Sequence, residues 1–300
     1  MSDFYRTFED RFRGSQDLIS RRLWQYQPFV QPVADAKLGN RAIDLGCGRG
    51  EWLRMLRELG QDATGVDLDD EMLQAARESG LDVQTTDALH FLKQQPDSST
   101  PVISAFHLVE HLPFDTLIAL IHEAQRCLMP GGVIILETPN PENLVVSTRN
   151  FFLDPTHIRP IPPLLLSYLV ETAGFSPVKV VRLQEDADLV NRSDVKLINV
   201  LEGVSPDYAI VAQKTGHEAL SAALGPAFER AFGLELSTLA NRYDEFIRGS
   251  IQTVGDEADL RLHRLSTEFS EMSKSLEELK ESVSLLKSEV EHLSTQTSSR

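Results

Sequence analysis

Three closely spaced glycines and one acidic residue form the part of the sequence best suited to chemistry. They lie in DLGCGRG, which runs from Asp44 to Gly50 between an apolar run and an amphipathic one. Glycine at 46, 48 and 50 lets the backbone turn tightly and approach a ligand, because a Cβ atom would occupy the ligand's space. The dinucleotide fingerprint G-x-G-x-x-G has its third glycine one residue later and receives an anionic pyrophosphate. The carboxylate of Asp44 suits a cationic ligand better, such as one with a sulfonium and an ammonium group.

Four titratable residues are candidates for acid–base chemistry. His107, Glu110 and His111 follow one apolar run, and His157 lies in a later Pro-rich segment. A base placed at a reacting hydroxyl typically accelerates a reaction by ~10²–10⁴. We predict catalytic roles for Glu110, His111 and His157. The alternatives are a helix cap for the Glu110–His111 pair and a hydrogen bond that fixes the loop for His157, while His107 could equally line the ligand site.

An alternation of short apolar runs and amphipathic segments from Arg41 onward must position these residues. Strands are expected at 41–45, 62–67, 82–86, 102–106, 132–138, 177–183 and 207–213. Helices are expected at 16–29, 50–59, 70–79, 87–94, 114–128 and 163–173, with a polar loop at 184–206. Strand–helix alternation predicts a parallel sheet covered on both faces. Ligands bind such sheets at the carboxyl ends of the strands, where the glycines and His107 are expected.

The order of motifs in residues 41–138 resembles class I S-adenosylmethionine-dependent methyltransferases. DLGCGRG resembles their first motif, and LMPGGVIILETP resembles the segment leading into their fifth strand. Asp67 matches the acid that this family uses on the ribose hydroxyls. Asp87 matches the acid that pairs with adenine. The resemblance implies S-adenosyl-L-methionine as cofactor, held by Asp44, Gly46, Cys47, Gly48, Gly50, Asp67, Leu68, Asp87 and Ala88. His107, beyond the fourth expected strand, is close enough to this motif to line the cofactor site as well.

A further cofactor contact is predicted near the start of the chain. Arg13 stands just before an expected helix, with Ser15 as a plausible N-cap. Free amide groups at a helix start attract anions. Arg13 therefore suits the carboxylate of the cofactor's methionine part, and a solvated arginine is the alternative.

Four further segments resemble bacterial methyltransferases encoded with surface-polysaccharide biosynthesis. They are FEDRFRGS, FHLVEHLPF, TPNPENL and LDPTHIRPIPP. Some of these proteins resemble the methyltransferase part of O-antigen chain-terminating enzymes, which also carry a coiled coil. The resemblance implies an O-methyltransferase for a saccharide or surface-polysaccharide acceptor, capping chain growth beside polysaccharide-assembly proteins. No kinase domain, which some chain terminators contain, is expected in a chain of this length.

The Pro-rich segment after residue 138 supplies candidate acceptor contacts. Asn140 and Asn143 in TPNPEN could hydrogen-bond a polyol or form turns. Asp154 and Arg159 flank His157, and we expect them to face the acceptor if this segment forms a lid.

The tail carries a strict apolar spacing. Ten residues alternate by three and four, namely Leu262, Leu265, Phe269, Met272, Leu276, Leu279, Val283, Leu286, Val290 and Leu293. This spacing predicts a left-handed coiled coil, preceded by a stutter after Ala258. A lone helix would leave the stripe in water, so a partner is required. We expect a homo-oligomer, and the alternative is a helix that folds back onto the catalytic domain.

These patterns together predict an α/β fold followed by an all-α tail. The expected fold is a Rossmann-like, seven-stranded methyltransferase domain with an N-terminal helical segment and a C-terminal coiled coil. The expected divisions are a helical lid at 1–40, the methyltransferase domain at 41–215, a helical connector at 216–260 and the coiled coil at 261–300.

The composition narrows the function classes. A formal net charge of −16 speaks against a nucleic-acid partner. Cys47 and Cys127 make neither a disulfide framework nor a zinc site, and no metal is expected. Without a signal peptide or a transmembrane run, we expect a cytoplasmic protein, with peripheral binding at the inner membrane as a further option. The alternatives for function are methylation of another small molecule or of tRNA, and a cofactor-binding coiled-coil scaffold.

Overall fold

The computed structural model describes residues 16–38 and 41–297. Contacts within the chain define two units, Met1–Tyr243 and Asp244–Arg300. The first unit contains the sheet and the candidate site, and the described part of the second, up to Thr297, is helical.

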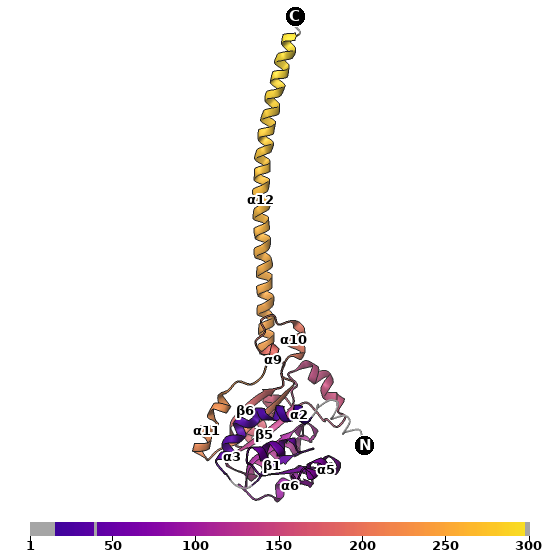
Figure 1. Cartoon of the computed structure of the whole chain (residues 1–300), viewed down its shortest axis with the longest axis vertical. Helices are drawn as coiled ribbons and strands as arrows, with labels where there is room; N and C mark the ends of the chain where they lie inside the picture. The colour runs from indigo at the N-terminus through magenta and orange to yellow at the C-terminus, as the bar shows by residue number, and fades with distance from the viewer. Residues whose placement is uncertain (1–15, 39–40, 298–300) are drawn as a thin grey trace. The chain divides into compact units, whose positions relative to one another are not determined.

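A seven-stranded sheet with the order β3-β2-β1-β4-β5-β7-β6 organises the first unit (Figure 1). Its strands are β1 (Ala42–Leu45), β2 (Ala63–Asp67), β3 (Asp82–Thr85), β4 (Thr100–Phe106), β5 (Leu128–Pro139), β6 (Phe175–Leu183) and β7 (Asp207–Lys214). The first five strands are parallel, as predicted, and β7 lies antiparallel between β5 and β6. This pairing places Asp207, the first residue of β7, opposite Pro139 at the end of β5.

Helices cover both faces of the sheet, because successive strand residues send their side chains to opposite faces. In β5, Ile134 and Leu136 pack with one set of helices, namely α6 (Ala88–Gln94), α7 (Phe114–Cys127) and α8 (Pro163–Thr172). Val133 and Ile135 pack with the other set, namely α2 (Gln16–Leu23), α3 (Gln27–Asp35), α4 (Glu51–Glu58) and α11 (Glu218–Glu229). The helices before β6 are α2 (Gln16–Leu23), η1 (Trp24–Tyr26), α3 (Gln27–Asp35), α4 (Glu51–Glu58), α5 (Asp70–Glu78), α6 (Ala88–Gln94), η2 (Val109–His111), α7 (Phe114–Cys127), η3 (Val146–Asn150), η4 (Phe151–Leu153) and α8 (Pro163–Thr172). The helix expected at 16–29 is thus three consecutive pieces that extend further along the chain.

Two short helices occupy the segment predicted as a polar loop at 184–206. They are α9 (Ala187–Val190) and α10 (Leu197–Glu202). Leu189 and Val200 from these helices pack with Leu239 in a small apolar cluster of its own. The loop prediction was wrong because helices of this length carry too few turns to show a period, and burial in this cluster stabilises them.

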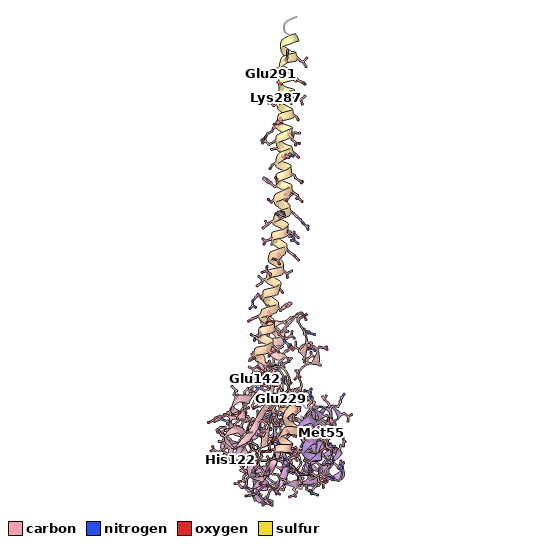
Figure 2. The ribbon with its side chains drawn as sticks, turned by 90° about the vertical axis from the view of Figure 1, so that its left-hand side faces the viewer. Met55, His122, Glu142, Glu229, Lys287 and Glu291 are labelled. Carbon is pink, nitrogen blue, oxygen red and sulfur yellow. The ribbon has the colours of Figure 1, made fainter. Side chains whose placement is uncertain are left out.

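The C-terminal helical region begins at α11 (Glu218–Glu229), which lies within the helical connector expected at 216–260. After a break, α12 runs uninterrupted from Leu236 to Thr297 (Figure 1). Side chains project from its distal part, where Lys287 and Glu291 are labelled (Figure 2). Residues 247–293 are exposed, including all ten apolar seam positions. Across the part of the chain that the structure describes, none of the helices combines the length and apolar character needed to cross a bilayer.

Candidate active site

Two adjoining cavities, each of about 230 Å³, open where β1, β2 and β4 end. They share Gly46, Gly48, Phe106 and His107 as lining residues. The first cavity is also lined by Ile19, Arg22, Leu23, Asp44, Cys47, Arg49, Glu51, Trp52, Glu137, Gln184 and Asp207. The second is also lined by Val66, Asp67, Leu68, Asp69, Met72, Thr86, Asp87, Ala88, Leu108 and Leu112. All predicted cofactor-binding residues except Gly50 and Arg13 line one or both cavities, and Arg13 lies outside the described residues.

The turn between β1 and α4 takes a backbone conformation that favours glycine. The φ angles at Gly46, Gly48 and Gly50 are +70°, +48° and +78°. A Cβ atom at Gly48 would meet only the Met72 methyl group, at 3.8 Å among the described residues, and would therefore project into the cavities. Gly50 has a different role, because a Cβ there would lie 2.6 Å from Leu81. Gly48 thus keeps space for a ligand, whereas Gly50 lets Leu81 pack against the start of α4.

Asp44 lies at the bottom of the first cavity and is only 2% exposed. Burial raises the pKa of Asp44 to about 8, against a hydrogen bond from Ser104 that lowers it. The Ser104 hydroxyl donates to Asp44 Oδ1 at 2.7 Å. The carboxylates of Asp67 and Glu51 raise this pKa further. A positive charge in the cavity would favour the ionised form of Asp44, as expected for a cationic ligand.

Two acidic residues mark the second cavity. Asp67, at the end of β2, accepts hydrogen bonds from the amides of Gly48 at 3.0 Å and Asp69 at 2.9 Å. Asp87 caps α6 by accepting from the His90 amide at 2.8 Å. An ionised carboxylate has about four acceptor sites. Both side chains therefore stay fixed by the backbone and keep acceptor capacity for hydroxyl and amino groups of a ligand.

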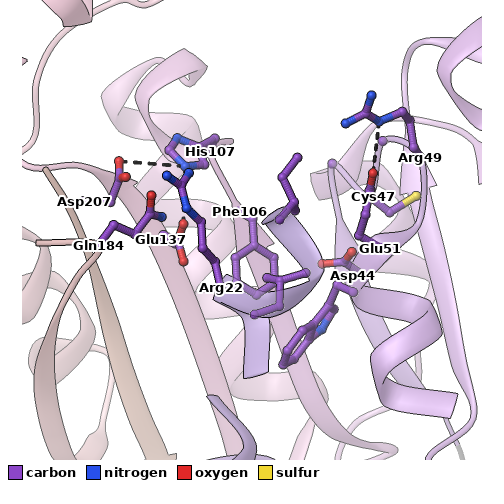
Figure 3. Close-up of a pocket in the computed structure, with 15 residues that line it drawn as sticks. Arg22, Asp44, Cys47, Arg49, Glu51, Phe106, His107, Glu137, Gln184 and Asp207 are labelled. Carbon is purple, nitrogen blue, oxygen red and sulfur yellow. Dashed lines mark hydrogen bonds and ion pairs between the residues drawn. The ribbon is translucent and has the colours of Figure 1, made fainter. Parts of the chain in front are cut away.

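His107 sits between carboxylates on the opposite side of the first cavity (Figure 3). Its Nδ1 lies 3.3 Å from Glu110 Oε1, and its Nε2 lies 3.3 Å from Glu137 Oε1 and 3.9 Å from Asp207 Oδ1. Burial lowers the pKa of His107, but these carboxylates outweigh burial and raise it to about 10. Burial raises the pKa of Asp207 to about 6, although His107 lowers it. His107 is thus an imidazolium near neutral pH and can donate hydrogen bonds but cannot accept a proton.

The sequence analysis missed several lining residues on this side. Arg22 comes from α2, Glu137 from β5, Gln184 follows β6, and Asp207 begins β7. Figure 3 shows Arg22 with His107 and Glu137 on one side, and Asp44 with Glu51 on the other. The hydroxyl of the buried Tyr26 donates to Glu137 Oε2 and holds that carboxylate in place. The positions of Glu137, Gln184 and Asp207 in the cavity depend on how the strands pair. In the sequence, only the acidic residues near strand ends could have indicated such a lining.

Glu110, His111 and His157, which we predicted as catalytic, lie together but line neither cavity. The rings of His111 and His157 are 4.7 Å apart, and His157 Nε2 lies 3.9 Å from Glu110 Oε1. Burial raises the pKa of Glu110, but His107 outweighs it and lowers the value to about 2. This cluster reaches the first cavity through His107.

The residues predicted to bind the acceptor have other contacts. Asn140 donates to Ser205 O, and Asn143 donates to the carbonyls of Glu202 and Val204. Both asparagines are buried and also accept from nearby backbone amides, which is the turn-forming alternative. Asp154 accepts from the amide and the hydroxyl of Thr156, and the Arg159 guanidinium stacks 4.2 Å from the Phe114 ring.

Comparison with known proteins adds to this geometry. A family model described as a methyltransferase domain matches residues 10–180. The chain belongs to this methyltransferase family. A solved S-adenosylmethionine-dependent methyltransferase from Archaeoglobus fulgidus is 32% identical, with a TM-score of 0.63 over 70% of this chain and 100% of that one. This chain is therefore an S-adenosylmethionine-dependent methyltransferase.

Curated relatives match a smaller region of this methyltransferase. A ubiquinone biosynthesis O-methyltransferase from Idiomarina loihiensis is 33% identical over 37% of this chain and 47% of its own length. A probable S-adenosylmethionine-dependent methyltransferase from Mycolicibacterium smegmatis is 29% identical over 53% of this chain and 61% of its own length. The chain thus spans about half the length of these relatives.

The cavities of the methyltransferase fit this cofactor. The open space at Gly48 leaves room for the cofactor next to the protein backbone. Asp67 and Asp87 offer acceptors for its hydroxyl and amino groups, and Asp44 offers a negative charge. Arg22 and Arg49 are guanidinium groups that line the first cavity and suit a carboxylate. When bound, S-adenosylmethionine supplies an electrophilic methyl group, so the protein's own task is to position and desolvate the acceptor.

Proposed function

We propose that this methyltransferase acts on a hydroxyl group of a saccharide or surface-polysaccharide acceptor, forming a methyl ether. The observation that carries the proposal is the polar side of the first cavity. His107 and Arg22 donate hydrogen bonds there, Glu137 and Asp207 accept them, and Gln184 does both. A sugar offers several hydroxyl groups that both donate and accept, which this lining can satisfy. The O-methyltransferase names of relatives support oxygen as the methylated atom.

Asp207 is the residue that we propose as the proton acceptor. Methylation of a hydroxyl releases a proton, and an efficient base has a pKa near the working pH. Asp207 lines the first cavity, and burial together with the Glu137 carboxylate raises its pKa to about 6, toward the working pH. Glu110, His111 and His157 then act as positioning residues, because Glu110 contacts His107 and His107 faces Asp207.

A phenolic acceptor is the second candidate, because curated relatives are named for ubiquinone biosynthesis. Trp52 and Phe106 give the first cavity an aromatic floor that could contact a phenol ring. The polar side of the cavity favours the saccharide.

Parallel incubations with each acceptor distinguish the two candidates. The purified full chain would be incubated with isotopically labelled S-adenosylmethionine and either surface-polysaccharide precursors or catechol-type quinone precursors. We expect label in a methyl ether of the glycan, located by mass spectrometry and NMR. Label in the phenol alone would overturn the saccharide assignment and leave the methyltransferase assignment intact.

We also propose that the tail self-associates as a coiled coil, with polysaccharide-assembly proteins as possible further partners. Each apolar seam residue from Leu262 to Leu293 is at least 48% exposed, which supports the need for a partner. A second copy supplies an identical stripe. Cys47 and Cys127 are free thiols, which supports a reducing compartment such as the cytoplasm. Peripheral binding at the inner membrane remains part of this proposal.

A further inference from the structure

One carboxylate and two imidazoles converge next to the cleft without lining it. Glu110 and His111 belong to η2, and His157 belongs to the segment that follows η4. The Ile158 amide donates to Glu110 O at 2.9 Å and joins the two segments. One potential ligand atom from each of the three side chains lies within 4.8 Å of the others. We propose that Glu110, His111 and His157 bind one divalent metal ion of the zinc class.

Glu110 offers one carboxylate oxygen to such an ion. Its side chain is fully buried, and Oε2 accepts a hydrogen bond from the Thr138 hydroxyl at 2.9 Å. Within the described part of the chain, Oε1 accepts no hydrogen bond, although it has His107 Nδ1 at 3.3 Å as an ion-pair neighbour. A buried polar atom without a hydrogen bond is costly and calls for an explanation. A metal ion on the His157 side of Oε1 provides one.

Both histidines are oriented as metal ligands usually are. His157 Nδ1 lies 2.6 Å from the carbonyl oxygen of Phe151, so Nδ1 carries the proton and Nε2 the lone pair that faces Glu110. The Thr156 hydroxyl donates to Asp154 and therefore accepts from His111 Nδ1 at 2.9 Å. Metal-binding histidines almost always donate their other ring N–H to a carbonyl or to a polar group, which fixes the tautomer.

The ligand set decides the class of metal. Two imidazoles and one carboxylate suit zinc and related transition metals, whereas magnesium and calcium prefer oxygen ligands. Bonds of about 2.1 Å in a tetrahedral site separate ligand atoms by about 3.4 Å. The three atoms, within 4.8 Å of one another, must approach by about 1 Å, which small rotations of two rings can supply. Three protein ligands leave a position for water or another small ligand.

The experiment uses the tag-free full chain after treatment with a chelator. It would be titrated with Co²⁺, whose visible absorption reports coordination number, and then with Zn²⁺ in competition. We expect one ion per chain, with the spectrum of a four- or five-coordinate site. The inference does not depend on the acceptor, because the measurement is metal binding and not methyl transfer.

Variants link the binding to these residues. His157→Gln should weaken Zn²⁺ binding by about 100-fold, because a ligand is lost. Thr156→Val keeps all three ligands and removes the hydroxyl that orients His111, so about 10- to 100-fold weaker binding is expected. His122→Gln, at an exposed histidine of α7 outside the cluster, should bind as the unchanged chain does.

Two results would overturn the proposal. The first is binding of less than one ion per chain at micromolar Zn²⁺. The second is equal affinity in the unchanged chain and Thr156→Val. Circular dichroism without metal shows whether each variant is folded. If His157→Gln does not fold, the affinity of Thr156→Val alone tests the proposal.

Discussion

Replacing Asp44 by asparagine should make the protein more stable and the cofactor site weaker. The pKa of this carboxyl in the folded protein is about 8, against its usual value of 3.8. Because the folded state disfavours the ionised form, the free energy of unfolding falls as the pH rises from about 4 to about 8. One pKa unit corresponds to about 1.4 kcal/mol, so ionisation opposes folding by at most about 4 kcal/mol at pH 7.

Asparagine removes this opposition and keeps the shape of the side chain. Its Oδ1 can still accept from the Ser104 hydroxyl, while burial of the amide group costs about 1–3 kcal/mol. A net gain of about 1–3 kcal/mol should raise the Tm by about 3–10 °C at pH 7. Binding should respond in the opposite direction, because the lost charge no longer attracts a cationic ligand. Hydrogen bonds to charged groups contribute about 1.5–3 kcal/mol, so the Kd should rise about 10- to 100-fold.

The stability prediction is tested by thermal unfolding at pH 5.5, 7 and 8.5. The affinity prediction is tested by calorimetric titration with S-adenosylmethionine. In the unchanged protein, cofactor affinity should increase with pH up to about 8, because binding ionises Asp44 and releases a proton. Asp44→Asn should show no such slope. Asp62→Asn, at an exposed position, is the matched control. A variant that is less stable than the unchanged protein at pH 8.5, or that binds with the same pH dependence, would refute the reasoning.

Three further substitutions, two of them with a matched control, test the other conclusions. Gly48→Ala and Gly80→Ala both place a side chain at positive φ and should each lose about 1 kcal/mol of stability, but only Gly48→Ala should abolish cofactor binding in calorimetry, because a Cβ at Gly80 has open space. Equal affinity in the two variants would contradict the cavity assignment. Leu286→Glu should loosen the tail's association by about 10²-fold or more in light scattering, whereas Ser288→Glu, two residues away on the outward face, should not. Asp207→Asn should lower kcat by about 10²–10⁴ with little change in cofactor affinity, and an unchanged kcat would remove it as the base.

Local signals made the cofactor side of the site predictable. Positive φ angles favour glycine, so the closely spaced Gly46 and Gly48 were a signal that the chain itself carries. Asp67 ends β2, and Asp87 lies two residues after β3 and caps the next helix. Such features depend on neighbours a few residues away, and a pattern of residue types records them.

The acceptor side depended on contacts between distant segments. Glu110 and His157 meet because the segment after η4 returns to η2, and Asp207 reaches His107 because β7 pairs antiparallel with β5. Asn140 looked like a polyol ligand, and its amide instead bonds to Ser205 O, a partner far along the chain. No spacing rule predicts these meetings.

The sequence by itself determined the strand–helix alternation, the glycine turn and the apolar seam of the tail, since each follows from a repeat or a conformation set within a few residues. Only the tertiary structure decided the charge of the groups in the site. Asp44 and His107 have pKa values of about 8 and about 10 because burial and neighbouring carboxylates act on them across the sheet. Electrostatic energy depends on distance and solvent exposure in three dimensions, and the order of residues specifies neither directly.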